Sequence, residues 1–445
     1  MKKAISIGIQ GFSALREQDC FFVDKTNFIK EWWENRDVVT LITRPRRFGK
    51  TLNMSMLECF FSNKYANRAD LFEGLSIWQE EAYRKLQGSY PVIFLSFAAV
   101  KAGNLEDAKT QIKQEIARLY RENRNLMKED IFGEDERELY YQTTVKMDDV
   151  TAQDSLRNLS EWMERYYGKK VIILLDEYDT PMQEAYVQGY WDEFTAFVRS
   201  LFNASFKTNP YLERAIMTGI TRVSKESIFS DLNNLQVITT TSDLYADCFG
   251  FTESEVFHVL DEFGMGDKKD EVKQWYDGFT FGEHKDIYNP WSITNYLDKR
   301  KTYPYWASTS SNGLVSRLIR TASADVKEKM EDLLNGREIV VSFDEQIVYN
   351  QLDHNENAIW SLLLASGYLK VKHVDYRGIT REPWYTLDIT NIETLSMFTT
   401  MFQDWFQNQD ANYGYFMKAL INGDLEAMNY YMNKVALATF SYFDV

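Results

Sequence analysis

Cysteine and histidine are both scarce in this chain of 445 residues, which has three of the former and four of the latter. The cysteines form no CxxC pair, so free thiols in a reducing compartment are favoured over a disulfide framework. The histidines are equally scattered, and no zinc-ligand spacing occurs. The sequence therefore predicts neither disulfides nor a zinc site. The residues concerned are Cys20, Cys59, Cys248, His258, His284, His354 and His373.

Long apolar runs and an excess of positive charge are also missing. No window approaches the roughly 20 apolar residues that a membrane-spanning helix needs, and residues 1–8 lack the apolar core of a signal peptide. The formal net charge of −16 argues against a generally nucleic-acid-binding surface. We therefore expect a cytoplasmic protein without membrane contact, for which charge does not support a nucleic-acid partner.

The most informative stretch that is present, residues 44–51, follows the apolar run 38–42. It matches the phosphate-binding pattern G-x-x-x-x-G-K-[ST], except that Arg44 replaces the first glycine. Backbone N–H groups of such a loop and of the next helix bind phosphate, while Lys50 is predicted to reach the β- and γ-phosphates and Thr51 to ligate magnesium. A basic strand-to-helix turn with a solvated Lys50 is the alternative. The predicted nucleotide-binding residues here are Arg44, Pro45, Arg46, Arg47, Phe48, Gly49, Lys50 and Thr51.

A second pattern supports a nucleotide site. Residues 171–175 are consecutive aliphatic residues, and Asp176 and Glu177 follow them. Such runs are typical of strands buried on both faces of a parallel sheet, and functional groups gather at the carboxyl ends of these strands. We predict that Asp176 holds magnesium, directly or through water, and that Glu177 polarises an attacking water. An ordinary acidic turn after the strand is the alternative.

Strand-like and helix-like segments alternate through the first half of the chain. This alternation predicts an α/β P-loop domain of three layers with a mainly parallel sheet. The other strand-like runs are 91–96, 212–219 and 235–240, and the helix-like segments are 26–35, 52–61, 104–125, 152–167 and 191–206.

Two residues near the end of the run 212–219 are further catalytic candidates. Thr218 is expected near Asp176, where a hydroxyl can sense the γ-phosphate, and Arg222 can supply positive charge to a phosphoryl transition state. Each has a plain alternative. Thr218 can be a satisfied hydroxyl at a strand end, and Arg222 can be a surface cation.

The second half of the chain has a different sequence pattern. The length of the whole chain predicts two or three domains. A helix capped at Thr252 is predicted, and residues 359–371 indicate a helix that turns at Gly367 into a strand, with 381–387 as its partner strand. Such a winged-helix-like module can contact DNA. The alternative is that it packs between domains, and this alternative is favoured because the region lacks a basic stripe. The predicted domains are a P-loop domain at 1–245, a helical lid at 246–330 and a winged-helix-like α+β domain at 331–445.

Several sequence blocks beyond the loop occur together: LDEYDTP at 175–181, TGITRVSKESIFS at 218–230, WYDGF at 275–279, YNPWS at 288–292, and YW at 305–306 followed by SSN at 310–312. In combination with residues 44–51, they resemble the bacterial AAA-ATPase-like proteins through nearly the whole chain. The resemblance implies a branch of P-loop ATPases near the AAA+ and STAND groups, using ATP and Mg²⁺. It gives Lys50, Thr51, Asp176 and Glu177 their motif roles, and the family pattern shares the arginine at position 44.

Members of this family commonly carry a PD-(D/E)xK nuclease-like domain after the ATPase part. This sequence stops at Val445, about where we expect that region to begin. The ExK-like stretches at 271–273 and 327–329 lie in helical, strongly charged contexts. We therefore expect no nuclease activity from this chain, which is either truncated or a shortened natural form.

Together these patterns predict a protein that binds Mg·ATP and hydrolyses it slowly as a conformational switch. One alternative is a nucleotide-binding scaffold without turnover, which serves as a platform for homo-oligomerisation or for docking an unknown protein partner. Another is an ATP-gated nucleic-acid effector module. The sequence identifies no trigger, oligomeric state or base preference.

Overall fold

The structure is a computed structural model. It describes residues 3–222, 228–229, 232–307, 313–345, 349, 352, 355–408, 419 and 423–439. Within these residues, no helix combines the length and the apolar character needed to cross a lipid bilayer.

The first half of the chain folds around a five-stranded sheet in the order β2-β3-β4-β1-β5. The strands are β1 (Val39–Thr43), β2 (Val92–Ser96), β3 (Val171–Asp176), β4 (Leu212–Gly219) and β5 (Leu235–Ile238). Every neighbouring pair is parallel, so all carboxyl ends lie along the same edge. The predicted α/β fold with a parallel sheet is confirmed.

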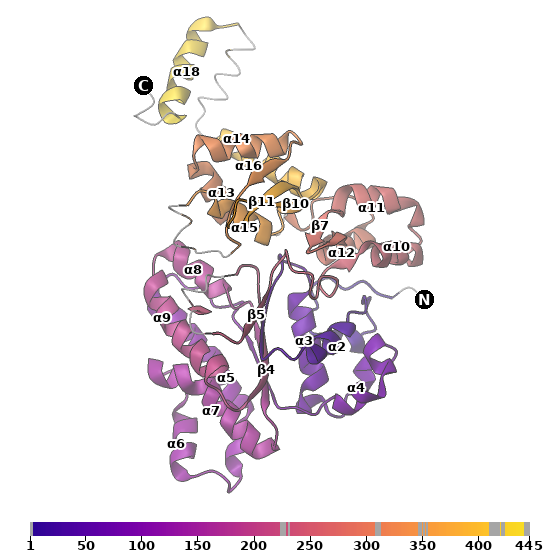
Figure 1. The fold of residues 1–445 in the computed structure, drawn as a ribbon, viewed down its shortest axis with the longest axis vertical. Helices are drawn as coiled ribbons and strands as arrows, with labels where there is room; N and C mark the ends of the chain where they lie inside the picture. Colours follow the sequence, from indigo (N-terminus) through magenta and orange to yellow (C-terminus); the bar gives the residue numbers. More distant parts are fainter. Residues whose placement is uncertain are drawn as a thin grey trace.

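Helices cover both faces of this sheet and complete the three layers (Figure 1). One face packs against α5 (Leu105–Glu122), α7 (Asp149–Tyr167) and α9 (Trp191–Phe202), and the other against α2 (Asn27–Asn35) and α3 (Lys50–Phe61). The shorter elements around them are α1 (Phe12–Glu17), α4 (Glu81–Leu86), α6 (Glu134–Gln142), α8 (Thr180–Gln188), η1 (Asn63–Tyr65), η2 (Ala69–Phe72), η3 (Ser76–Gln79), η4 (Arg124–Lys128) and η5 (Asn203–Lys207).

Strand β3 explains why its sequence is apolar without interruption. Val171, Ile173 and Leu175 lie in the core beneath α5, α7 and α9, whereas Ile172 and Leu174 lie in the core beneath α2 and α3. Since successive side chains of a strand point to opposite faces, a strand covered on both sides needs apolar residues at every position.

A second, smaller sheet follows, in the order β6-β8-β7. Its strands are antiparallel, and β6 and β8 pack with three helices around a separate core, whereas Phe279 and Phe281 of β7 belong to the main core. Helix α10 begins as predicted: Thr252 Oγ1 accepts a hydrogen bond from the N–H of Glu255, and the Glu255 carboxylate accepts one from the N–H of Thr252. The elements are β6 (Phe251–Thr252), α10 (Glu253–Glu262), η7 (Gly266–Lys268), α11 (Lys269–Tyr276), β7 (Phe279–Phe281), β8 (His284–Tyr288) and α12 (Pro290–Lys299).

The C-terminal region lies above the carboxyl edge of the parallel sheet (Figure 1). It contains an antiparallel sheet in the order β10-β11-β9 and a helix that turns at Gly367, whose φ is +81°, into β10, as the sequence predicts. The elements are α13 (Gly313–Thr321), α14 (Ala324–Leu334), β9 (Ile339–Val341), α15 (Ala358–Ala365), β10 (Leu369–Arg377), β11 (Glu382–Ile389), α16 (Ile392–Asn408) and α18 (Leu425–Thr439).

One buried carboxylate joins the second and C-terminal regions. Glu393 of α16 is fully buried, and it accepts hydrogen bonds from Ser292 Oγ of α12 (2.8 Å) and from the N–H of Trp306 (2.6 Å). Burial raises the pKa of this carboxyl to about 7. The ionised form is therefore disfavoured in the folded protein relative to the unfolded chain.

We expect this group to make folding stability depend on pH. Between the unfolded pKa of about 4.5 and the folded value of about 7, the folded protein holds the extra proton, so the free energy of unfolding falls as pH rises. The loss amounts to about 3 kcal/mol once Glu393 is ionised in both states. Urea unfolding at pH 5 and pH 8 should give a smaller pH difference for Glu393→Gln than for wild type. Exposed Glu328→Gln is the matched control, and an unchanged pH difference in Glu393→Gln would contradict the assignment.

Candidate nucleotide-binding site

The predicted phosphate-binding loop connects the carboxyl end of β1 to α3. Helix α3 begins at Lys50, and Gly49 before it has a φ of +79°, in the left-handed region that glycine adopts without strain. Arg47 has a φ of +66°, which is uncommon for a residue with a Cβ. The helix therefore starts inside the motif, and its unpaired N–H groups lie at the carboxyl edge of the sheet.

The structure brings four of the predicted site residues together at this edge. Thr51 Oγ1 donates to Asp176 Oδ2 at 2.7 Å, and Thr218 Oγ1 donates to Asp176 Oδ1 at 2.5 Å. Lys50 Nζ donates to the carbonyl oxygens of Arg44 (2.9 Å) and Pro45 (2.8 Å). The start of α3 and the ends of β3 and β4 thus meet around one carboxylate and one ammonium group.

Burial sets the electrostatics of this group. It raises the pKa of Asp176, the adjacent Glu177 carboxylate raises that pKa further, and the two threonine hydroxyls and Lys50 act in the opposite direction. Burial likewise lowers the pKa of Lys50. A ligand that brings its own charges to both groups would therefore relieve two desolvated side chains at once.

Glu177 follows Asp176 in a left-handed conformation, with a φ of +51°. Its side chain is half-buried, and its Oε2 accepts a hydrogen bond from Thr180 Oγ1 at 3.1 Å. This conformation is strained for a residue with a Cβ, so the surrounding contacts must hold it.

Arg44 is placed differently from its basic neighbours. Its guanidinium is fully buried, donates to the carbonyl oxygens of Thr43, Thr239 and Tyr245, and lies 4.4 Å from the ring centroid of Phe281. Burial lowers its pKa to about 9, so the side chain is charged at neutral pH. The side chain of Arg44 thus packs into the protein, and its carbonyl group receives Lys50.

The rest of the loop packs against the second region. Asn289 Nδ2 donates to the carbonyl oxygen of Arg46 at 3.2 Å, and the exposed Arg47 guanidinium lies 4.2 Å from the ring centroid of Trp291. Phe48 is buried, with its ring 4.8 Å from that of Phe279 and 5.4 Å from that of Phe281. These contacts place the WYDGF and YNPWS blocks beside the loop, a neighbourhood that no local sequence pattern predicts.

The C-terminal region touches the loop as well. Gly367, between α15 and β10, packs so closely on the loop that an added Cβ would lie 2.7 Å from Pro45 Cγ. Arg46 also lines a small cavity of about 40 Å³ with Thr221, Trp306 and Ser366. The candidate phosphate loop is therefore held between all three regions of the chain.

Arg222, the remaining predicted residue, lies among residues of the C-terminal region. It lines a hollow of about 580 Å³ that also includes Phe343, Glu345 and Tyr385. Glu345 accepts hydrogen bonds there from the hydroxyls of Thr241 (2.8 Å) and Tyr385 (3.0 Å). Arg222 thus lies beside residues of the C-terminal region, whereas Asp176 is bonded to Thr51 and Thr218.

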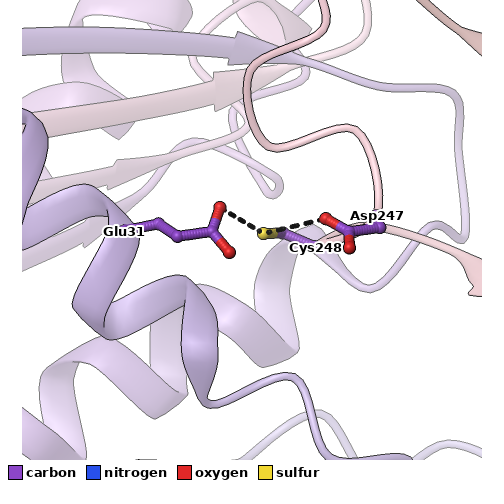
Figure 2. A group of neighbouring side chains, drawn as sticks. All are labelled: Glu31, Asp247 and Cys248. Atoms are coloured by element: carbon purple, nitrogen blue, oxygen red, sulfur yellow. Dashed lines mark hydrogen bonds between the residues drawn. The ribbon is translucent and has the colours of Figure 1, made fainter. Parts of the chain in front are cut away.

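A separate group of potential metal ligands lies around Cys248. Figure 2 shows the Cys248 thiol between the carboxylates of Glu31 and Asp247, whose ligand atoms lie within 4.8 Å of one another. The thiol donates to Glu31 Oε2 at 3.4 Å. Burial raises the pKa of Cys248 well above its ordinary value, so the thiol keeps its proton and this contact requires no metal. Glu31 and Cys248 are too far apart in sequence for any spacing rule to have found them.

A phosphate-loop motif between β1 and α3, facing a carboxylate at the end of a parallel strand, defines a P-loop-type α/β domain. The chain belongs to the AAA-ATPase-like family, described as "Predicted AAA-ATPase", whose family model matches residues 6–229. It is also similar to a protein of Azotobacter chroococcum mcd 1 described as an uncharacterized protein in the vnfD 5'region. The two sequences are 27% identical over 398 residues, which cover 88% of this chain and 68% of that protein.

Proposed function

We propose that the protein binds Mg·ATP at residues 44–51 and hydrolyses it slowly, so that the nucleotide state acts as a conformational switch. The observation that carries the proposal is the 2.7 Å hydrogen bond between Thr51 Oγ1 and Asp176 Oδ2, next to the ammonium group of Lys50. P-loop ATPases use these three groups together to hold the metal ion and the terminal phosphates.

The residues fit a magnesium ion, since the Thr51 hydroxyl and the Asp176 carboxylate are oxygen donors of the kind that Mg²⁺ prefers. Both would hold the ion, which when bound neutralises charge on the phosphates. Lys50 would exchange the carbonyl oxygens of Arg44 and Pro45 for phosphate oxygens. Loop N–H groups and the start of α3 would bind the remaining phosphate charge.

We assign the proton-transfer step to Glu177, which would accept the proton of an attacking water. Thr218 would respond to the terminal phosphate through its hydrogen bond to Asp176. Arg222 would contribute to the transition state only after turning out of the hollow that it lines. Positioning and charge neutralisation would then supply most of the catalysis.

Nucleotide binding without turnover is the second candidate. It is favoured by the packing of the loop at Pro45 and Phe48 against both later regions, because a scaffold needs nucleotide only to fix that packing. Homo-oligomerisation or docking of a protein partner would then be its output.

We also propose domain bounds at 1–245, 246–330 and 331–445, with the last part winged-helix-like. The antiparallel sheet β10-β11-β9 with α13, α14 and α15 supports this assignment. An ATP-gated nucleic-acid role would use that module. The net charge of −16 disfavours such a role, and unchanged ATPase rate and DNA mobility at low salt would exclude it.

Replacing Lys50 by alanine tests nucleotide binding. We expect the dissociation constant for Mg·ATP to rise by about 10- to 100-fold, because the variant loses charge-assisted hydrogen bonds to the phosphates. Calorimetric titration measures this change, and native mass with and without ATP reports any oligomer. The exposed Lys170→Ala is the matched control. Equal affinity in wild type and Lys50→Ala would contradict the assigned site.

A further inference from the structure

One buried carboxylate ties the turn after β3 to the end of β4. Asp179 Oδ2 accepts hydrogen bonds from the N–H groups of Ile220 (2.9 Å) and Thr221 (2.8 Å) and from the Thr221 hydroxyl (2.8 Å). Its side chain is only 4% exposed, and burial raises its pKa. Burying an ionised carboxylate this deeply costs little free energy only while its hydrogen-bond donors stay in place.

Neighbouring contacts tighten the same junction. The N–H of Tyr178 donates to the carbonyl oxygen of Thr218 at 3.0 Å. The Tyr178 hydroxyl donates to the carbonyl oxygen of Thr221 at 2.7 Å. An added Cβ on Gly219 would lie 2.6 Å from Asp179 Oδ1, so the turn after β3 approaches the end of β4 as closely as glycine allows. Neither strand end can shift without breaking several of these contacts.

Glu177 lies between the two tie points. On one side, Asp176 is bonded to Thr218, and on the other, Asp179 is bonded to Thr221. These bonds flank Glu177, whose backbone is left-handed with a φ of +51°. Releasing either tie would let the Glu177 carboxylate relax away from the edge of the sheet.

The C-terminal region reaches this junction through Tyr349. Its hydroxyl lies 3.0 Å from Thr221 Oγ1, and since the Thr221 hydroxyl gives its single proton to Asp179, Tyr349 is the donor. The ring of Tyr349 is buried against Tyr186 of α8 and Trp191 of α9, at 5.5 and 5.4 Å between centroids. A displacement of the C-terminal region would therefore move Thr221, the hydrogen-bond partner of Asp179.

We propose that Asp179 is a positioning residue for ATP turnover, and that the C-terminal region regulates turnover by acting on it through Tyr349 and Thr221. This inference rests on the proposed ATPase function. Asp179 touches neither phosphate nor water in this role. It fixes the Glu177 turn against β4, so its loss should lower kcat and leave nucleotide affinity unchanged.

The test measures kcat and KM for phosphate release, and the dissociation constant for Mg·ATP, on the full chain. We expect Asp179→Ala to lower kcat by about 100-fold, the effect of a misplacement of about 1 Å, with affinity within about twofold of wild type. Asp179→Asn keeps an acceptor oxygen and should recover most of that loss. Tyr349→Phe removes one hydroxyl, keeps the ring, and should lower kcat by about fivefold. Tyr305→Phe, which loses a hydroxyl bonded to the Lys301 carbonyl, is the control and should match wild type.

Equal kcat in Asp179→Ala and wild type would overturn the inference, as would a Tyr349→Phe rate equal to that of Tyr305→Phe. A rise in the dissociation constant that parallels the fall in kcat would also overturn it, by indicating general damage. Tyr349→Phe decides the matter if Asp179→Ala does not fold. Wild type that turns over ATP no faster than Glu177→Gln would overturn the ATPase proposal and this inference together, whereas a clear wild-type rate confines any failure to Asp179.

Discussion

Replacing Glu177 by glutamine should lower ATP turnover by about 10²- to 10⁴-fold, the usual contribution of a general base. Glutamine has nearly the same size and can still accept the hydrogen bond from Thr180 Oγ1, but it cannot take a proton from water. Because Lys50, Thr51 and Asp176 remain, Mg·ATP affinity should stay within about threefold of wild type. Phosphate release and nucleotide titration on the same preparation separate the two effects.

Glu193→Gln is the matched control, since this glutamate is exposed on α9. It should leave both turnover and binding unchanged. An equally low rate in wild type and Glu177→Gln, with intact ATP binding in both, would support the scaffold that binds nucleotide without hydrolysing it.

Replacing Arg44 by alanine should lower the free energy of unfolding by about 3–5 kcal/mol, comparable to other large-to-small changes in a core. The substitution leaves the carbonyl oxygens of Thr43, Thr239 and Tyr245 without this donor, and it opens a cavity beside Phe281. Urea unfolding measures the loss.

Three further variants divide this effect into its causes. Arg44→Met fills most of the cavity and isolates the lost hydrogen bonds, whereas Arg44→Lys keeps the charge without the planar group that spans several carbonyls. Arg47→Ala, on the exposed side of the same loop, should cost less than about 1 kcal/mol. A cost for Arg44→Ala no larger than that for Arg47→Ala would show that the buried guanidinium does not stabilise the fold.

Local sequence patterns were sufficient for the architecture of the first half. The apolar run before Lys50 and the one before Asp176 predicted β1 and β3, and the run 212–219 predicted β4 at its observed bounds. The meeting of Thr51, Asp176 and Thr218 followed from a general property of parallel sheets, whose carboxyl ends share an edge.

What could not be predicted depends on contacts between distant parts of the chain. Arg44 occupies the position of the first glycine of the phosphate-loop motif, but its partners Thr239 and Tyr245 lie 195 and 201 residues away, and no local pattern reports them. The sequence carried only a weak signal for Asp179. It is a third acidic residue close to Asp176 and Glu177, and burying it costs free energy unless hydrogen-bond donors are buried with it. Tyr349, whose hydroxyl contacts the Thr221 hydroxyl, lies in a region with no recognisable sequence motif.

The contact between Gly367 and Pro45 has a thermodynamic consequence. If phosphate binding alters the backbone of the loop, it changes the free energy of that contact, and the two events become coupled. Coupling free energies are reciprocal. Under the proposed function, a ligand or partner that displaces the C-terminal region would change the affinity for ATP, and ATP would change the affinity for that ligand or partner by the same factor. If the protein binds nucleotide as proposed, the close contact of Gly367 with Pro45 links that binding to the position of the C-terminal region.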